Sequence, residues 1–192
     1  MLRLGEISAL LRGPGAFLEP RLGEPQGPRE LFSGVVAPLM AVRSVAVLVP
    51  SFIAGRPLVG VVLALGNFVL QLGTWLGLAL VLPTLCRQAQ VTLPERGAFA
   101  LATYALVPLW LAGALYVLPE DPAFVWLWSR ALVLAVASYG AFVMYRGLAV
   151  LGIAGKVRTA LTLGVTVASV TLYFTLFILL GISSHILLRL LD

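Results

Sequence analysis

The chain contains few of the residues from which catalytic and metal sites are built. Among its 192 residues there is one cysteine, Cys86, and one histidine, His185. A single cysteine excludes a disulfide within the chain, and a histidine with no cysteine, histidine or acid at ligand spacing predicts no metal site. Ser184 and His185 are adjacent, so on a helix their side chains would point about 100° apart and could not form a nucleophile and base pair without other partners. We therefore expect no catalytic residues, no enzymatic activity and no cofactor.

Charged residues are also scarce. They make up 11% of the chain against 60% hydrophobic residues, and the mean hydropathy is +1.04. Soluble domains carry about 25% charged residues, so this composition predicts an integral membrane protein. The net charge is +5, but the arginines are scattered singly and do not form a nucleic-acid-binding face. We expect them to meet anionic lipid headgroups at the inner membrane surface, and we expect no nucleic acid.

Five apolar stretches are long enough to cross a bilayer as helices. A hydrocarbon core of about 30 Å needs roughly 20 residues, because each helical residue rises about 1.5 Å. The apolar runs are continuous, whereas barrel strands would alternate polar and apolar residues. Residues 31–192 are therefore predicted to form an all-α integral membrane bundle of five transmembrane helices. The expected spans are residues 34–54, 57–82, 97–118, 124–145 and 159–187.

Lysine and arginine are distributed unevenly over the connections between these spans. With the N-terminus inside, the outer segments hold only Arg56 and Arg189. The inner segments hold nine basic residues, namely Arg3, Arg12, Arg21, Arg29, Arg87, Arg96, Arg146, Lys156 and Arg158. Because basic loops stay on the cytoplasmic side, the sequence predicts an inner N-terminus and an outer C-terminus.

Residues 1–30 form a separate region ahead of the first span. Apolar residues recur at helical spacing over residues 4–11, opposite Arg3, Glu6 and Arg12. This pattern predicts a short amphipathic helix that lies on the inner membrane surface. Prolines and glycines are frequent from position 13 to position 29, so we expect a stiff, irregular linker without helix there.

Arg43 lies near the middle of the first expected span, and the spans contain no aspartate or glutamate to pair with it. A charge at the bilayer centre costs about 2.5 to 3.5 kcal/mol on insertion scales, which argues against a chance occurrence. Residues equally far from the connecting turns lie at about the same depth in antiparallel helices. This counting predicts a polar layer of Arg43, Asn67, Gln71, Tyr173 and the Tyr104 carbonyl, which Pro108 leaves without its helical hydrogen bond.

The layer has several interpretations. It is a structural brace, or it lines a path for a solute, or Arg43 extends to the headgroups and the amides only join helices. The fifth span carries Thr162, Thr166, Ser169 and Tyr173 on one helix face. That face either lines a water path or packs against a neighbouring helix.

Two stretches of the sequence resemble a known family. YALVPLWLAGALYVLP at residues 104–119 contains Tyr104 and Pro108, and YRGLAVLGI at residues 145–153 contains Tyr145 and Gly147. Together with the following Lys156 and Arg158, these stretches are similar to the third span and the end of the fourth span of the Yip (Ypt-interacting protein) domain family. Thr103 stands where the family has a glycine, and the Asp-Leu-Tyr-Gly-Pro element of eukaryotic members has no counterpart here.

The resemblance implies a polytopic membrane protein that acts in membrane organisation or trafficking. We expect a non-enzymatic organiser that works through contacts with lipids, with a protein partner or with further copies of itself. The alternative is a small-solute or anion transporter or channel with a path past Arg43. An organiser predicts a dry, well-packed bundle, whereas a transporter predicts a continuous polar cavity. The chain has twelve arginines and one lysine and is rich in alanine, leucine, glycine and valine, which is typical of a high-GC genome and favours a bacterial inner membrane.

Overall fold

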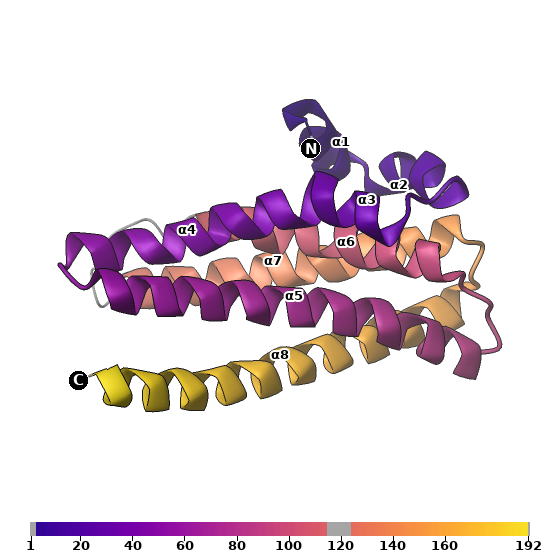
Figure 1. Ribbon diagram of the computed structural model, residues 1–192. Helices are drawn as coiled ribbons and strands as arrows, with labels where there is room; N and C mark the ends of the chain where they lie inside the picture. The colour runs from indigo at the N-terminus through magenta and orange to yellow at the C-terminus, as the bar shows by residue number, and fades with distance from the viewer. Residues whose placement is uncertain (1–2, 115–123, 192) are drawn as a thin grey trace.

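The computed structural model describes residues 3–114 and 124–191, and within these ranges the chain is helical with no β-strand (Figure 1). The predicted all-α class is confirmed. The helices are α1 (Leu4–Arg12), α2 (Pro14–Gly23), α3 (Pro28–Leu31), the π-helical turn η1 (Phe32–Val36), α4 (Ala37–Ile53), α5 (Pro57–Gln88), α6 (Glu95–Ala112), α7 (Phe124–Val150) and α8 (Gly155–Leu191).

Among the residues that the structure describes, three helical segments are long and apolar enough to cross a membrane, which supports membrane association. They are Pro28–Ile53, Pro57–Gln88 and Gly155–Leu176. Large apolar side chains cover their outer faces: Leu65 on α5 is 62% exposed and Val167 on α8 is 65% exposed. Apolar surface of this extent is expected where a protein faces lipid instead of water.

The turn between α4 and α5 follows directly from its sequence. Gly55 has a φ of +71°, the left-handed region in which glycine avoids the strain of a side chain. The Arg56 amide donates to the Ser51 carbonyl at 2.9 Å, and Pro57 occupies the first turn of α5, where a helix needs no amide donor. The two helices therefore run antiparallel from a tight turn.

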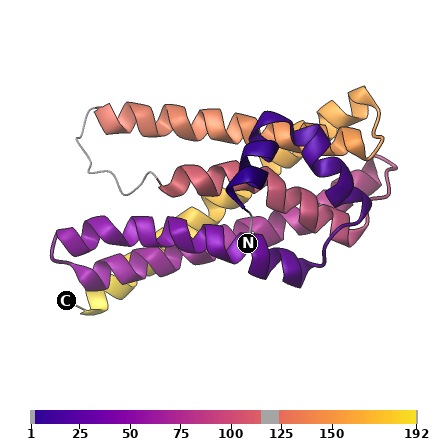
Figure 2. The same cartoon turned by 90° about the horizontal axis from the view of Figure 1, so that it is seen from above.

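α5 lies between α4 and α8, and α7 packs along α6 (Figures 1 and 2). Two glycines of α5 allow α8 to approach closely. A Cβ atom on Gly73 would lie 2.9 Å from Leu176 Cδ1, and one on Gly77 would come closer still to Leu172 Cδ2. Small residues at such positions are typical of packed membrane helices.

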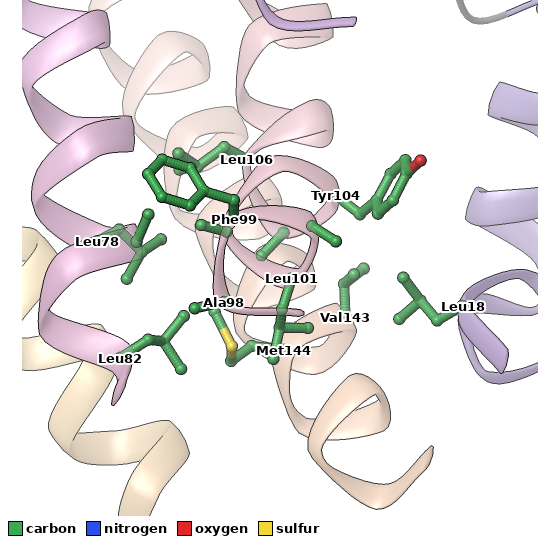
Figure 3. Packing of buried hydrophobic residues seen from close by; sticks show 14 of the residues in the cluster. Leu18, Leu78, Leu82, Ala98, Phe99, Leu101, Tyr104, Leu106, Val143 and Met144 are labelled. Atoms are coloured by element: carbon green, nitrogen blue, oxygen red, sulfur yellow. The ribbon is translucent and has the colours of Figure 1, made fainter. Parts of the chain in front are cut away.

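α6 is the central helix of the bundle. Every residue from Gly97 to Pro108 is buried, because α5 covers one side and α7 and α2 cover the others. Figure 3 shows Leu101 of α6 among side chains of the neighbouring helices, with Leu78 and Leu82 to one side and Leu18 to the other. A helix that is apolar on all faces is expected at such a buried position.

The predicted irregular linker is wrong between Pro14 and Gly23, where the chain forms α2. Proline suits the first turn of a helix, and Pro20 near the last turn removes only one helical hydrogen bond. Phe17, Leu18 and Leu22 are buried against the bundle. Burial of these three side chains outweighs the weak helical propensity of the segment.

The helix predicted over residues 4–11 is present as α1, but it is tied to the bundle and does not simply lie on a surface. Leu10 is fully buried, and the Tyr139 hydroxyl of α7 donates to the Leu11 carbonyl at 2.7 Å. Leu11 itself remains 44% exposed. One apolar side of α1 therefore faces protein, and another stays available to lipid.

Candidate functional site

Arg43 is the most deeply buried charge for which the structure describes a side chain, with an exposed fraction of 4%. It lies in the middle of α4, beside the C-terminal end of α6. Gly113, directly after α6, lies against the aliphatic part of its side chain. α6 ends well short of the far ends of α4, α5 and α7 (Figure 2). The negative end of the α6 dipole is thus next to a cation.

A small cavity of about 10 Å³ lies beside Arg43. Its polar wall consists of Arg43, Gln71, Thr74 and Tyr173, from α4, α5 and α8, and α6 closes it with apolar residues and Trp110. A space of about this size holds one water molecule. The structure therefore brings together Arg43, Gln71 and Tyr173, which depth counting placed in one layer.

Asn67 joins this group through Gln71. The Gln71 Nε2 donates to the Asn67 carbonyl at 3.2 Å and also to Asn67 Oδ1, one helical turn earlier on α5. Gln71 Oε1 is buried, and it has no hydrogen-bond partner within the described part of the chain. A buried amide oxygen without a donor is costly, so a water in the small cavity is a natural partner for it.

Tyr104 lies on the other side of α6. Its ring packs edge-on against Phe17 of α2, with 5.3 Å between the ring centroids, and the Arg21 guanidinium carbon is 5.9 Å from its ring centre. Figure 3 shows Tyr104 on the side that faces Leu18. Pro108 is buried within α6. Neither residue lines the cavity beside Arg43.

The other two residues of the family resemblance lie at the end of the bundle that holds α2. The Arg158 Nη2 donates to the Tyr145 hydroxyl at 2.7 Å, and the guanidinium carbon lies 4.1 Å from the centre of that ring. A Cβ on Gly147 would lie 3.3 Å from Leu18 Cδ1 and closer to Leu101. Both residues therefore hold helices together.

A second and larger cavity of about 350 Å³ lies between α5, α6, α7 and α8, with Arg43 contributing from α4. Most of its wall is aliphatic. The polar exceptions besides Arg43 and Tyr173 are the hydroxyls of Thr74, Thr166 and Ser169. Each donates to the carbonyl four residues earlier, at 2.8, 2.8 and 2.7 Å respectively. Their protons are engaged, so they present oxygen lone pairs.

Three features near the site, the Trp75–Thr103 hydrogen bond, Thr74 and Gly113, were not predicted from the sequence. The Trp75 indole donates to Thr103 Oγ1 at 2.9 Å and joins α5 to α6. Thr74 follows Gln71 by three residues, which places both on one helix face, and this spacing is a signal that could have identified it. Gly113 gave no such signal, because the apolar stretch continues past it.

The N-terminal helices are joined by an ion pair. Arg21 of α2 contacts Glu6 of α1 at 2.7 Å, and its guanidinium carbon lies 3.8 Å above the Phe17 ring. The Arg3 amide donates to the Glu6 carboxylate at 2.8 Å. This hydrogen bond, followed by the charge of Arg21, lowers the pKa of Glu6. α1 and α2 thus form one unit on the bundle.

No group of three or more histidines, cysteines or acids that could hold a metal occurs among the residues the structure describes. Cys86 is buried with a free thiol, and the side chain of His185 lies outside the described residues. Compared with protein-family models, curated proteins and solved structures, the chain has no significant match in any of the three. The Yip resemblance therefore rests on the residues quoted above.

Proposed function

We propose that the chain is a non-enzymatic integral membrane protein of Yip type, which organises the membrane by binding anionic headgroups and partner proteins at one end. The observation that carries this proposal is the exposed basic surface at the end where α5 and α7 stop and α6 and α8 start. Arg87, Arg96, Arg146 and Lys156 are all exposed there. α2 packs against α6 and α7 near this end (Figure 1).

The charge balance supports an inner location for this end. The segments that we expect on the inner side hold nine basic residues and five acids, namely Glu6, Glu19, Glu24, Glu30 and Glu95, which leaves them a net charge of +4 by subtraction. Juxtamembrane basic clusters bind anionic lipids with about 1 kcal/mol per lysine or arginine near the surface. We place five spans in a bacterial inner membrane, with α6 and α7 as the third and fourth, the N-terminus inside and the C-terminus outside.

The walls of the larger cavity favour this proposal over the transport alternative. An anion path needs polar groups along its whole length, because a desolvated ion gains nothing from aliphatic walls. The cavity of about 350 Å³ is lined mainly by aliphatic side chains of α5 to α8. In liposomes we expect no anion flux, and flux that disappears in Arg43→Gln would favour the transporter.

Lipid selectivity tests the proposal directly. The purified protein is reconstituted with spin-labelled phosphatidylglycerol or phosphatidylcholine, and the motionally restricted fraction is measured by electron paramagnetic resonance. We expect enrichment of phosphatidylglycerol, which the combined change of Arg87, Arg96 and Lys156 to glutamine abolishes. Arg56→Gln, an exposed arginine in the turn at the other end, is the matched control and should leave the enrichment unchanged. Equal restriction of both lipids in the unmodified protein would refute the proposal.

Orientation is tested separately. A periplasm-active reporter fused to the C-terminus is expected to be active, and a cytoplasm-active reporter at the same place is expected to be silent. The reverse result would place the basic surface outside and would remove its anionic inner-leaflet partner.

A further inference from the structure

The larger cavity is open on the side that faces lipid. α7 and α8 meet at the loop of residues 151–154 and separate toward their other ends (Figures 1 and 2). Leu134 of α7 and Phe174 of α8 line the cavity and are 68% and 58% exposed. α5 and α6 form its floor. A molecule dissolved in the bilayer can therefore enter between α7 and α8 without passing through water.

The size and the lining of the larger cavity suit one hydrocarbon chain of an amphiphile. A volume of about 350 Å³ falls at the lower end of the range of about 300 to 1,000 Å³ for small-molecule sites. Along α8 the wall extends from Val165 to Phe174, nine residues apart, which is about 13 Å at a rise of about 1.5 Å per residue. Met144, Leu78 and Val165 make one end mainly apolar.

The opposite end is polar and carries a cation. Arg43 and Tyr173 line it together with the hydroxyl of Thr74, whose proton is engaged with the Leu70 carbonyl. Ser169, in the same wall, likewise donates to Val165. The wall therefore offers guanidinium donors on one side and hydroxyl lone pairs on the other.

We propose that this cavity binds a long-chain carboxylic acid, with its carboxyl group toward Arg43 and its hydrocarbon chain along α7 and α8. A carboxyl group fits this polar wall in either protonation state. The carboxylate oxygens accept from the guanidinium, and the protonated acid still accepts through its carbonyl oxygen while its O–H donates to a hydroxyl oxygen. An ester has neither the charge of the first form nor the donor of the second. A phosphate monoester head carries a charge of about −1.5 to −2 at neutral pH, whereas Arg43 is the one cation in the cavity lining that the structure describes.

The carboxyl group determines selectivity. Bilayer tails are as apolar as the aliphatic wall, so moving the hydrocarbon chain from lipid into the cavity contributes little. The discriminating contact is that of the head with Arg43, which is 96% buried and so acts in a medium of low dielectric constant. An acid and its methyl ester, which share one chain, are therefore the decisive pair of ligands.

The test is photolabelling of the full chain in nanodiscs of zwitterionic lipid. The probe is a long-chain carboxylic acid with a diazirine on its hydrocarbon chain, and mass spectrometry locates the adducts. We expect adducts on cavity-lining residues of α7 and α8, among them Ala137 and Val170. Unlabelled acid should compete about tenfold better than its methyl ester, the effect of one charge-assisted hydrogen bond. Equal competition by the ester, or stronger competition by a monoacyl phosphate, would overturn the proposal.

Two alanines of α7 provide a matched pair of variants. Ala137 lines the cavity and Ala135 does not, and both are exposed. Ala137→Phe fills the cavity and should reduce labelling by about tenfold, whereas Ala135→Phe should leave it unchanged. Arg43→Gln should remove the difference between acid and ester. Labelling that Ala137→Phe leaves unchanged would show that the probe binds elsewhere. None of these outcomes depends on the basic surface at the inner end, so the site can fail while the proposed function stands.

Discussion

Gly113 lies directly against the side chain of Arg43. A Cβ atom on Gly113 would come within 3.0 Å of Arg43 Cβ and closer to its Cγ and Cδ. Gly113 follows Ala112, the last residue of α6, whose backbone carbonyls form the negative end of the helix dipole. The buried cation therefore packs directly against the end of α6, and position 113 has no room for a residue larger than glycine.

Gly113→Ala should destabilise the bundle. The added methyl group would displace the Arg43 side chain or the end of α6, and overpacking of this kind costs about 1 to 3 kcal/mol. We expect a lower Tm in detergent. The control is Gly66→Ala on α5, where an added Cβ has no neighbour within 4 Å and where alanine favours the helix. Equal Tm values for Gly113→Ala and the unmodified protein would show that Arg43 is not confined by this contact.

Thr103→Val should lower the free energy of unfolding by removing a hydrogen bond between α5 and α6. The change keeps the shape of the side chain but removes the oxygen that accepts the Trp75 indole proton at 2.9 Å. A buried donor left without its acceptor costs about 1 to 3 kcal/mol. Reversible unfolding in mixed micelles should show this loss and a shift of tryptophan emission. Thr84→Val is the control, because Thr84 is exposed and bonds only to its own helix. A neutral Thr103→Val would mean that the indole finds another acceptor.

The sequence predicts the position of a residue along a helix axis better than the direction in which its side chain points around that axis. The length of each apolar stretch locates a helix, and the tight turn at Gly55 preserves depth between α4 and α5. This is why Arg43 and Gln71 could be matched. Depth does not fix rotation about the helix axis, so the packing of the Tyr104 ring on Phe17 of α2 could not be inferred. The predicted role of the Tyr104 carbonyl in the layer stays a prediction.

Three further features could not be predicted, because they depend on tertiary contacts and not on local sequence patterns. Local signals such as Pro20 and its glycine neighbours predicted no helix in α2, because the tertiary contacts of Phe17 and Leu18 that stabilise it are not visible in a local pattern. The end of α6 beside Arg43 was hidden because apolar residues continue after Ala112. The cavity between α7 and α8 depends on how two helices diverge, which no periodicity encodes.

Acidification should loosen α1. The folded state lowers the pKa of Glu6 through the Arg3 amide and the Arg21 charge. A depressed carboxyl pKa contributes stability above the unfolded value of 4.5, and this contribution is lost as the pH falls through the folded value. A spin label at Ala9, in a Cys86→Ala background, should therefore become more mobile below pH 4.5 and stay constant above it.

Glu6→Gln is the matching variant for this titration. The amide oxygen can still accept from the Arg3 amide, but the charge that contacts Arg21 is gone. We expect a label mobility that is raised at neutral pH and does not change further on acidification. Glu24→Gln, an exposed acid at the end of α2, should retain the full response. A response that persists in Glu6→Gln would assign the titration to another group.

Tyr139→Phe should release α1 at all pH values. The Tyr139 hydroxyl donates to the Leu11 carbonyl at 2.7 Å and to the Leu10 carbonyl at 3.3 Å, and these carbonyls belong to the last turn of α1, where no helical amide serves them. Loss of the hydroxyl leaves both carbonyls without this donor and removes the only hydrogen bonds found between α1 and α7 within the described residues. Faster amide hydrogen exchange over residues 5–12 is the expected result, with little change in Tm, because the buried side chains of α2 still hold that helix.

Tyr145→Phe is the control for Tyr139→Phe, because it also removes a tyrosine hydroxyl from α7 but not the one that contacts α1. The Tyr145 hydroxyl accepts from Arg158 of α8 at 2.7 Å, so its removal should speed exchange at the start of α8 and leave α1 unchanged. If both variants accelerated exchange in α1 equally, the hydroxyl of Tyr139 would not be the attachment point, and α1 would be held by Leu10 and the Glu6–Arg21 ion pair instead. If only Tyr139→Phe did so, a single hydrogen-bonded contact controls whether the N-terminal helix remains on the bundle or is free to lie on the membrane surface.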